Sequence, residues 1–265
     1  MNSDLARHNV EISLEGVSMV FGKKGKQVVV LQDITFDVKQ HEFVSLIGPA
    51  GCGKSTLLRL MADLLQPTKG HITIQKEHPR EVHLRRKFGI VLENPTLFEW
   101  RTVRENMELP LELIGHSRAL YKERMDHLLD TVGLMKFSDY YPWQLSSGMR
   151  IRVAIARALS LDPPVLFMDE PFSALDEFTK EKLQLELLEI KKKTNKTIVF
   201  VAHRISEAVF LSDRIIVISA HPGRVHSQHH IDLGVSRTPQ TRESELFHDL
   251  TKAIRNCLPE GSDAL

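Results

Sequence analysis

The feature that most constrains this chain is a glycine-rich segment between an apolar run and a helix-forming stretch. Residues 43–47 are mainly apolar and of strand-forming type, and residues 54–60 favour a helix. Between them the chain reads Gly48-Pro49-Ala50-Gly51-Cys52-Gly53-Lys54-Ser55-Thr56, which contains the G-x4-G-K-[ST] pattern of a phosphate-binding loop. Such a loop converges backbone N–H groups and a helix N-terminus on phosphate oxygens. The chain is therefore predicted to bind a nucleoside triphosphate, with Lys54 on the outer phosphates and Ser55 on Mg2+.

The composition is that of an ordinary globular protein. Its 265 residues allow one large α/β domain or two small ones. The 35 Lys and Arg residues balance 34 acids, which gives no basic footprint for nucleic acid. Two cysteines, Cys52 and Cys257, are too few for a disulfide framework and favour a reducing cytosol. Because we find neither a signal peptide nor the ~20 apolar residues that span a bilayer, we expect any membrane role to come through a partner.

Strand patterns lie on both sides of the phosphate loop. Residues 11–22, 28–31 and 34–38 predict a small antiparallel sheet, and residues 71–74 and 88–92 predict two further strands. Phe21 stands just before a turn at residues 22–26. Its ring could belong to the core or could stack on an adenine base, a contact worth ~1–3 kcal/mol by analogy with base stacking.

The middle of the chain turns helical. Residues 102–141 predict an all-helical insertion, in which apolar side chains recur at helical spacing at Leu120, Tyr121, Met125, Leu128, Leu129 and Val132. A second helix begins at Ser146-Ser147-Gly148 and continues to about residue 160. The serines could be a plain helix cap, which on this pattern alone is favoured, or part of a second anion site.

Acidic residues end the next apolar strand. Residues 165–169 predict a buried parallel strand that finishes in Asp169 and Glu170. In a protein with a phosphate loop, Asp169 would meet Mg2+ through water and Glu170 would polarise the attacking water as general base. An acidic strand end that merely faces solvent is the alternative. Ser173 and Asp176 follow, before a predicted helix at 177–193.

A histidine ends the strand at residues 197–202. His203 lies where parallel α/β sheets place their ligands, so we favour a γ-phosphate contact over a structural role. The remaining predictions are a strand at 215–218, a turn at Pro222-Gly223, a helix at 243–256 and a frayed tail at 259–265.

Together these motifs resemble the nucleotide-binding subunit of an ATP-binding cassette (ABC) transporter, over roughly residues 10–235. The family's signature corresponds to Leu145-Ser146-Ser147-Gly148-Met149, its Walker B motif ends in Asp169-Glu170, and its D-loop is Ser173–Asp176. His203 matches the family's switch histidine. Segments 94–103, 170–176 and 219–225 are more closely similar to importer subunits of the nitrate, sulfonate and taurine type.

The resemblance implies an α/β fold, in which a P-loop NTPase core with a mainly parallel sheet carries an N-terminal antiparallel β-subdomain and an inserted α-helical subdomain. Residues 1–265 would form a single ATP-binding domain. Its expected parts are the core with the β-subdomain at 10–92 and 161–235, the Q-loop and helical subdomain at 93–160, and a C-terminal helix and tail at 236–265.

The resemblance also implies a function. Two chains, most simply a homodimer, would pair head to tail and hydrolyse ATP with Mg2+. Each ATP would lie between the phosphate loop of one chain and the signature of the other, with Phe21 on adenine. Catalysis would involve Glu170, His203 and Lys54, and the metal would be held by Ser55, Asp169 and Glu93.

The implied partners are integral membrane permease subunits, docked near residues 93–105 and the helical insertion, and, in import systems, a solute-binding protein. The chain would thus be peripheral at the cytoplasmic side of the membrane. No nucleic-acid partner is expected.

Two positions depart from the family pattern. Glu93 replaces the Q-loop glutamine; its carboxylate could ligate the metal, but without a raised pKa it adds negative charge beside the γ-phosphate. Ser147 replaces the first glycine of the signature, at a cost of about 1–3 kcal/mol if that position needs a positive φ.

These departures keep alternatives open. One is an ATP-binding regulatory scaffold with weak hydrolysis, and another is the ATPase of a lipid or export system. A soluble ABC protein acting on DNA or ribosomes is less favoured, because this chain has neither tandem cassettes nor long coiled-coil insertions. A small-molecule P-loop kinase would leave the signature and His203 unexplained.

Overall fold

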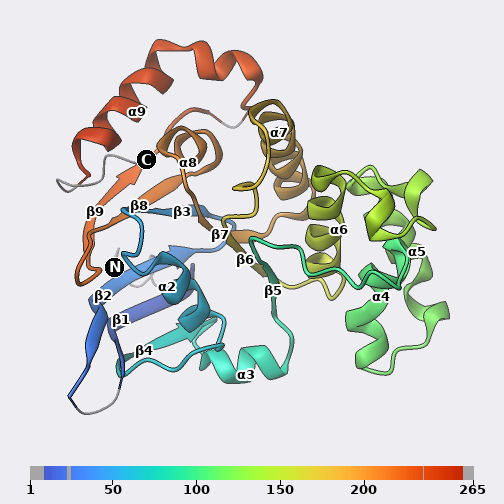
Figure 1. Cartoon of the computed structure of the whole chain (residues 1–265), viewed down its shortest axis with the longest axis horizontal. Coiled ribbons are helices and arrows are strands. Elements are labelled where there is room, and N and C mark those ends of the chain that lie inside the picture. Colours follow the sequence, from blue (N-terminus) through green and yellow to red (C-terminus); the bar gives the residue numbers. More distant parts are fainter. Residues whose placement is uncertain (1–8, 23–24, 235, 259–265) are drawn as a thin grey trace. The chain divides into compact units, whose positions relative to one another are not determined.

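The computed structural model describes residues 9–22, 25–234 and 236–258, and the chain separates into two compact units (Figure 1). The first unit combines Met1–Arg85 with Thr197–Leu265, and the second is Arg86–Lys196. Two predictions fall partly or wholly outside the described residues, namely the turn through residues 23–24 and the tail at 259–265. Within the described ranges, no helix is both long enough and apolar enough to cross a bilayer.

The predicted antiparallel sheet is present in the first unit. Strands β1 (Val10–Phe21), β2 (Val28–Lys39) and β4 (Lys69–Ile74) pair in the order β2-β1-β4. The two expected strands at 28–31 and 34–38 are a single strand. Asp33 takes a left-handed φ of 55°, and the register shifts beside it, so a bulge interrupts the apolar alternation without ending the strand.

The first unit also contains the strands that carry the phosphate loop. Strands β7 (Thr197–Val201), β3 (Phe43–Ile47) and β8 (Arg214–Ile218) are parallel neighbours in that order. Every residue of these three strands is buried, as expected for parallel strands covered on both faces. Strand β9 (Val225–His230) pairs antiparallel with β8 and was not predicted, because its sequence is mostly polar.

Helices flank these strands. Helix α2 (Lys54–Met61) is shorter than the predicted 54–65, since Ala62 is its C-cap and Asp63 adopts a φ of 54°. The predicted C-terminal helix is α9 (Glu245–Asn256). Two short helices, α3 (Pro79–Leu84) and α8 (Ile205–Leu211), and the 3-10 turn η3 (Pro239–Glu243) were not predicted.

Arg214 of β8 forms a buried ion pair with Glu42 and also bonds the backbone of β2. Arg214 donates from Nε and Nη2 to the two carboxylate oxygens of Glu42, at 2.8 and 2.9 Å, and from Nη2 to the carbonyl of Asp37 at 2.6 Å. Both charged groups are almost fully buried and have lost their hydration. Each charge is therefore stabilised by the other in place of water.

The second unit contains two parallel strands and four α-helices. Strand β5 (Phe88–Val91) pairs in parallel with β6 (Val165–Asp169); each strand was predicted from its apolar run, whereas their pairing was not. The helical stretch predicted at 102–141 consists of α4 (Val103–Leu113), α5 (Arg118–Thr131) and the 3-10 turns η1 (Met135–Phe137) and η2 (Pro142–Gln144). Helices α6 (Ser147–Leu159) and α7 (Glu177–Thr194) match the two helices predicted later in the chain.

One expected core residue of this unit is exposed. Leu120 is 79% exposed because it lies in the first turn of α5, just off the stripe that faces the core. The other members of the pattern are buried, namely Tyr121, Met125, Leu128, Leu129 and Val132.

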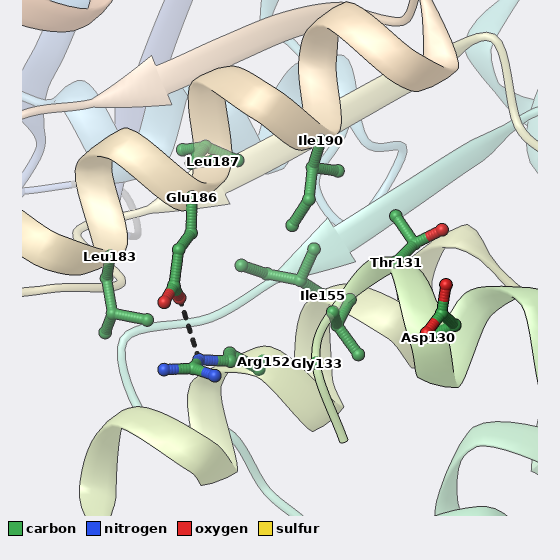
Figure 2. Close-up of a pocket in the computed structure, with 10 residues that line it drawn as sticks. Asp130, Thr131, Gly133, Arg152, Ile155, Leu183, Glu186, Leu187 and Ile190 are labelled. Atoms are coloured by element: carbon green, nitrogen blue, oxygen red, sulfur yellow. Dashed lines mark ion pairs between the residues drawn. The ribbon is translucent and has the colours of Figure 1, made fainter. Parts of the chain in front are cut away.

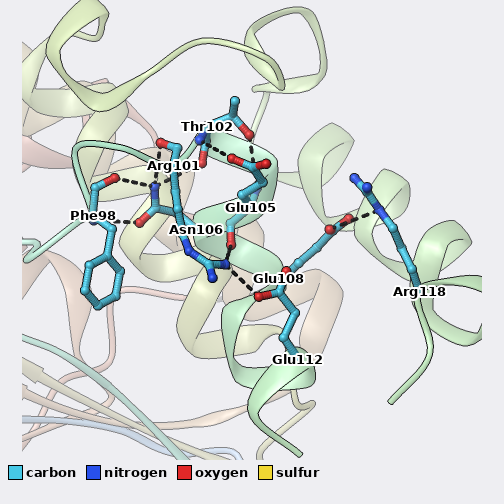
Figure 3. Close-up of polar contacts among 8 residues, drawn as sticks. All are labelled: Phe98, Arg101, Thr102, Glu105, Asn106, Glu108, Glu112 and Arg118. Atoms are coloured by element: carbon cyan, nitrogen blue, oxygen red, sulfur yellow. Dashed lines mark hydrogen bonds and ion pairs between the residues drawn. The ribbon is translucent and has the colours of Figure 1, made fainter. Parts of the chain in front are cut away.

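The β5–α4 loop, residues 92–102, is held by a buried side chain from α4 (Figure 3). Asn106 is fully buried, and its Oδ1 accepts a hydrogen bond from the backbone N–H of Phe98 at 2.8 Å. Its Nδ2 donates to the carbonyls of Phe98, Arg101 and Thr102 at 3.0–3.1 Å. One amide thus contacts four backbone groups of the loop, and among these the Phe98 N–H and the Arg101 carbonyl have Asn106 as their partner; these contacts fix the loop's course before α4 begins.

We predict that Asn106→Ala loosens this loop. Removing the amide leaves buried backbone groups without partners, at a cost of roughly 1–3 kcal/mol. Amide hydrogen exchange over residues 96–103 should become about tenfold faster or more, a factor that corresponds to ~1.4 kcal/mol. Asn94→Ala, which changes an exposed side chain of the same loop, is the control and should leave this exchange unaltered. Equal exchange in the two variants would contradict the assignment.

Candidate functional site

The phosphate loop connects β3 to α2 in a conformation that excludes larger side chains. A Cβ on Gly48 would lie 2.2 Å from the carbonyl oxygen of Ile218, so the backbone passes closer to β8 than any other residue permits. Gly53, the N-cap of α2, has a φ of 100°, and a Cβ there would lie 2.7 Å from Leu31 Cδ2. The loop therefore follows the tight path expected for a segment that wraps an anion with its backbone.

Lys54 begins α2, and its ammonium group turns back over the loop. Nζ donates to the carbonyls of Gly48 and Pro49 at 2.7 and 3.1 Å, and the residue is 8% exposed. Cys52 Sγ lies 3.9 Å from the same nitrogen. Burial raises the pKa of the Cys52 thiol, and the Lys54 charge opposes that rise only in part. The loop thus presents one cation beside a neutral thiol.

Two other predicted residues of the first unit end strands. His203 is exposed and follows β7, the parallel neighbour of β3, so His203 and Gly48 leave the same carboxyl edge of the sheet. Its backbone N–H donates to Glu207 at 3.4 Å. Phe21 ends β1 opposite Val28 and is 38% exposed, which is inconsistent with the alternative that it is a core residue.

The predicted acids lie at the end of β6 in the second unit. Asp169 is the last residue of the strand and is 6% exposed. Glu170 has a left-handed φ of 46°, which costs a non-glycine residue of order 1 kcal/mol or more. Its carbonyl accepts a hydrogen bond from the N–H of Ser173 at 3.1 Å and closes a turn. The predicted base therefore stands in a strained backbone held by this acid turn, residues 170–173.

Asp176, the last residue of the predicted D-loop, is the N-cap of α7. Its Oδ1 accepts from the backbone N–H of Thr179 at 3.0 Å. That hydrogen bond lowers the pKa of the Asp176 carboxyl, although the side chain is exposed. Asp176 therefore fixes the start of α7.

The predicted signature forms the start of α6. Ser146 is its N-cap and accepts from the N–H of Met149 at 3.3 Å, so the serine-cap interpretation is confirmed; an anion site there stays a prediction. Ser147 lies in the first helical turn and is not among the residues with positive φ, so the strain that could follow from replacing glycine does not arise. A Cβ on Gly148 would lie 3.1 Å from Thr179 Cγ2, which explains a glycine where α6 meets α7.

Glu93 lies exposed in the β5–α4 loop and has a partner that the sequence did not indicate. Ser173 Oγ donates to Glu93 Oε1 at 3.1 Å, although the residues are 80 positions apart. The same loop is tied to α6 by Arg157, which donates to the carbonyls of Pro95 and Thr96 at 2.7 and 3.0 Å. Burial lowers the pKa of the Arg157 guanidinium.

A cavity of about 160 Å³ lies among α5, α6 and α7 (Figure 2). The ion pair between Arg152 Nε and Glu186 Oε2, 2.8 Å long, crosses it and joins α6 to α7. Burial raises the pKa of Glu186, and Arg152 partly opposes the shift. Because the surrounding apolar side chains of α7 are already 3% exposed or less, the cavity offers a ligand little further apolar surface. We interpret it as a feature of helix packing.

Two residues that shape the site were missed from the sequence. Asn106 is an intrinsically poor helix former inside α4, a weak signal that it serves another purpose. Arg157 gave no signal, because a basic residue in the last turn of a helix is common.

Known proteins match this arrangement. The family described as ABC transporter matches residues 31–173, a little more than half of the chain. The taurine import ATP-binding protein TauB of Jannaschia sp. is 41% identical over 221 residues, which cover 83% of this chain and 82% of TauB. The aliphatic sulfonates import ATP-binding protein SsuB of Bacillus cereus is 41% identical over 243 residues, covering 92% of this chain and 94% of SsuB.

A solved structure agrees with these relatives. The dimeric, post-hydrolysis ATP-binding cassette MJ0796, bound to ADP and Pi, superimposes with a TM-score of 0.71 at 32% identity; the match covers 83% of this chain and 98% of that one. The α/β fold, with a mostly parallel sheet and a separate antiparallel sheet, is that of the ABC ATPase cassettes. The chain belongs to the ATP-hydrolysing, ATP-binding subunits of the ABC transporter family.

Proposed function

We propose that this chain powers import of a small solute, hydrolysing ATP in a head-to-tail dimer bound to the cytoplasmic face of a membrane permease. The observation that carries the proposal is the phosphate loop, where Gly48 and Gly53 occupy positions that a Cβ would block and Lys54 supplies a buried cation. Its relatives TauB and SsuB, named for taurine and aliphatic sulfonate import, support the direction of transport and a small cargo that carries a sulfonate group. A solute-binding protein would deliver that cargo.

In the bound state, Lys54 would exchange its carbonyl partners for the outer phosphates of ATP. Phe21, half exposed at the end of β1, would stack on adenine, and His203 would contact the γ-phosphate. The signature of the partner chain, at the N-terminus of α6, would complete each site. Because each chain has one phosphate loop and one signature, a head-to-tail pair provides two complete sites.

Mg2+ fits the donor chemistry of the chain. The Ser55 hydroxyl and the Asp169 carboxylate are hard oxygen ligands of the kind that Mg2+ prefers, used together with phosphate oxygens. The ion would neutralise charge on the β- and γ-phosphates. Glu170 would take a proton from the attacking water. Glu93 as a further ligand stays a prediction, and its bond to Ser173 suggests another role.

The permease would dock on the β5–α4 loop and α4, close to residues 93–105. The rings of Phe98 and Trp100 pack in a tilted arrangement with centroids 4.9 Å apart, and Trp100 is 72% exposed. An apolar surface held in place by Asn106 suits a protein partner, because its binding costs little ordering of the loop.

We predict that Glu170→Gln abolishes hydrolysis and preserves nucleotide binding. Loss of a general base lowers kcat by roughly 10²–10⁴-fold. Size-exclusion chromatography in ATP and Mg2+ should show the variant as a stable dimer, because the ATP-bound dimer reopens only after hydrolysis. Glu189→Gln, an exposed change on α7, should behave as the wild type. A wild type that dimerises with ATP yet is as inert as Glu170→Gln, with the permease present, would favour the regulatory scaffold.

We further predict that Asp169→Asn weakens the use of Mg2+. Losing the anionic oxygen should raise the Mg2+ concentration for half-maximal hydrolysis about tenfold, the lower range for loss of a group supporting a metal. Binding of ATP measured in EDTA should be the same in variant and wild type. An unchanged Mg2+ requirement would exclude Asp169 from the metal site.

A further inference from the structure

A hydrogen bond between Glu93 and Ser173 joins two segments of the second unit. One contains Glu93, which departs from the family pattern, and the other contains Glu170, the proposed general base. Glu93 stands where the family has glutamine, and its Oε1 accepts from Ser173 Oγ at 3.1 Å. A carboxylate only accepts hydrogen bonds, and it holds a hydroxyl donor more strongly than a neutral amide does. The substitution therefore strengthens this one contact while it removes the amide donor.

Ser173 is the last residue of the acid turn, and both its backbone N–H and its hydroxyl donate hydrogen bonds. Its backbone N–H donates to the carbonyl of Glu170 at 3.1 Å, while its hydroxyl donates to Glu93. Two consecutive hydrogen bonds thus run from the Glu93 carboxylate to the backbone of Glu170. That backbone is strained, with a φ of 46°, and a strained residue keeps its conformation only where neighbouring contacts impose it.

The acceptor end of this chain of bonds is itself held. Arg157 donates to the carbonyls of Pro95 and Thr96, just after Glu93. Asn106 holds the far end of the same loop through Phe98. The backbone of the segment that carries Glu93 is therefore hydrogen-bonded to side chains of two helices. These bonds hold the exposed Glu93 carboxylate in a fixed position.

The geometry points to Glu93 as a positioning residue that holds the acid turn through Ser173 and so sets the direction of the Glu170 side chain. This role rests on the proposed function, in which Glu170 is the general base. It differs from the metal-ligand role expected from the family, since Glu93 acts on the base through protein and not on Mg2+. Glutamine at 93 keeps an acceptor oxygen and should preserve most of the effect.

A double-mutant cycle in the purified full-length chain tests the proposal. Glu93→Ala and Ser173→Ala should each lower kcat about five- to tenfold, a factor within the range for loss of one typical hydrogen bond. The double variant should lose no more than either single variant, because both remove the same bond. The KM for ATP and the Mg2+ dependence should stay unchanged, and Glu93→Gln should recover most of the rate. Glu189→Ala is the control for removing a surface carboxylate.

Hydrogen exchange without nucleotide gives an independent readout. Exchange over residues 169–176 should become faster to the same degree in both single variants and in the double variant, and should be normal in Glu93→Gln and Glu189→Ala. If Glu93→Ala raises the Mg2+ requirement while Ser173→Ala does not, Glu93 is a metal ligand and the proposal fails. Additive losses of kcat, or unchanged exchange in both single variants, would also overturn it.

Failure of the proposed function would look different. In that case the wild type would hydrolyse no ATP, even with a permease, whereas the exchange experiment would still report whether Glu93 and Ser173 hold the turn. If the wild type were inert and exchange were still faster in both alanine variants, the contact between Glu93 and Ser173 would be supported and its role in catalysis would be rejected.

Discussion

The close passage of the phosphate loop beneath β8 is the constraint on which the site depends. At Gly48 the backbone lies so near the carbonyl of Ile218 that a single methyl group would not fit. That approach requires β3 and β8 to be adjacent parallel strands, and their pairing follows from mainly apolar sequences whose residues are all buried. The loop's anion-binding geometry is thus a consequence of sheet packing. The positive charge at the site comes separately, from Lys54.

In the second unit the residues that we propose for catalysis lie on loops or at helix ends. The acid turn and the β5–α4 loop contain little regular structure, and these two segments and the start of α6 are fixed by a few hydrogen bonds. Asn106 and Arg157 donate to backbone carbonyls of the β5–α4 loop, and Asp176 and Ser146 cap the helices that follow. Polar residues in this unit therefore do for the loops what apolar burial does for the strands.

How much the sequence predicted follows from this division. Buried parallel strands, the phosphate loop and the longer helices produce strong local patterns and were located within a few residues, whereas the short helices α3 and α8 were missed. Strand β9 escaped because its polar sequence depends on β8 for its conformation. The bond between Glu93 and Ser173 could not be predicted at all, since it joins side chains 80 residues apart that only the fold brings together. Conversely, the motif predicted possible backbone strain at Ser147. The residue lies in the first turn of the capped helix α6 without a positive φ, so this strain does not arise.

The measurement that tests the central claim most directly is equilibrium binding of ATP, with Mg2+, to the wild type and to Lys54→Ala, with the folding of both verified by thermal denaturation. The account predicts that the wild type binds ATP, and that loss of the buried cation weakens binding at least tenfold, about the contribution of a charge-assisted contact to phosphate. Equal affinity in the two proteins, or no binding by a folded wild type, would contradict it.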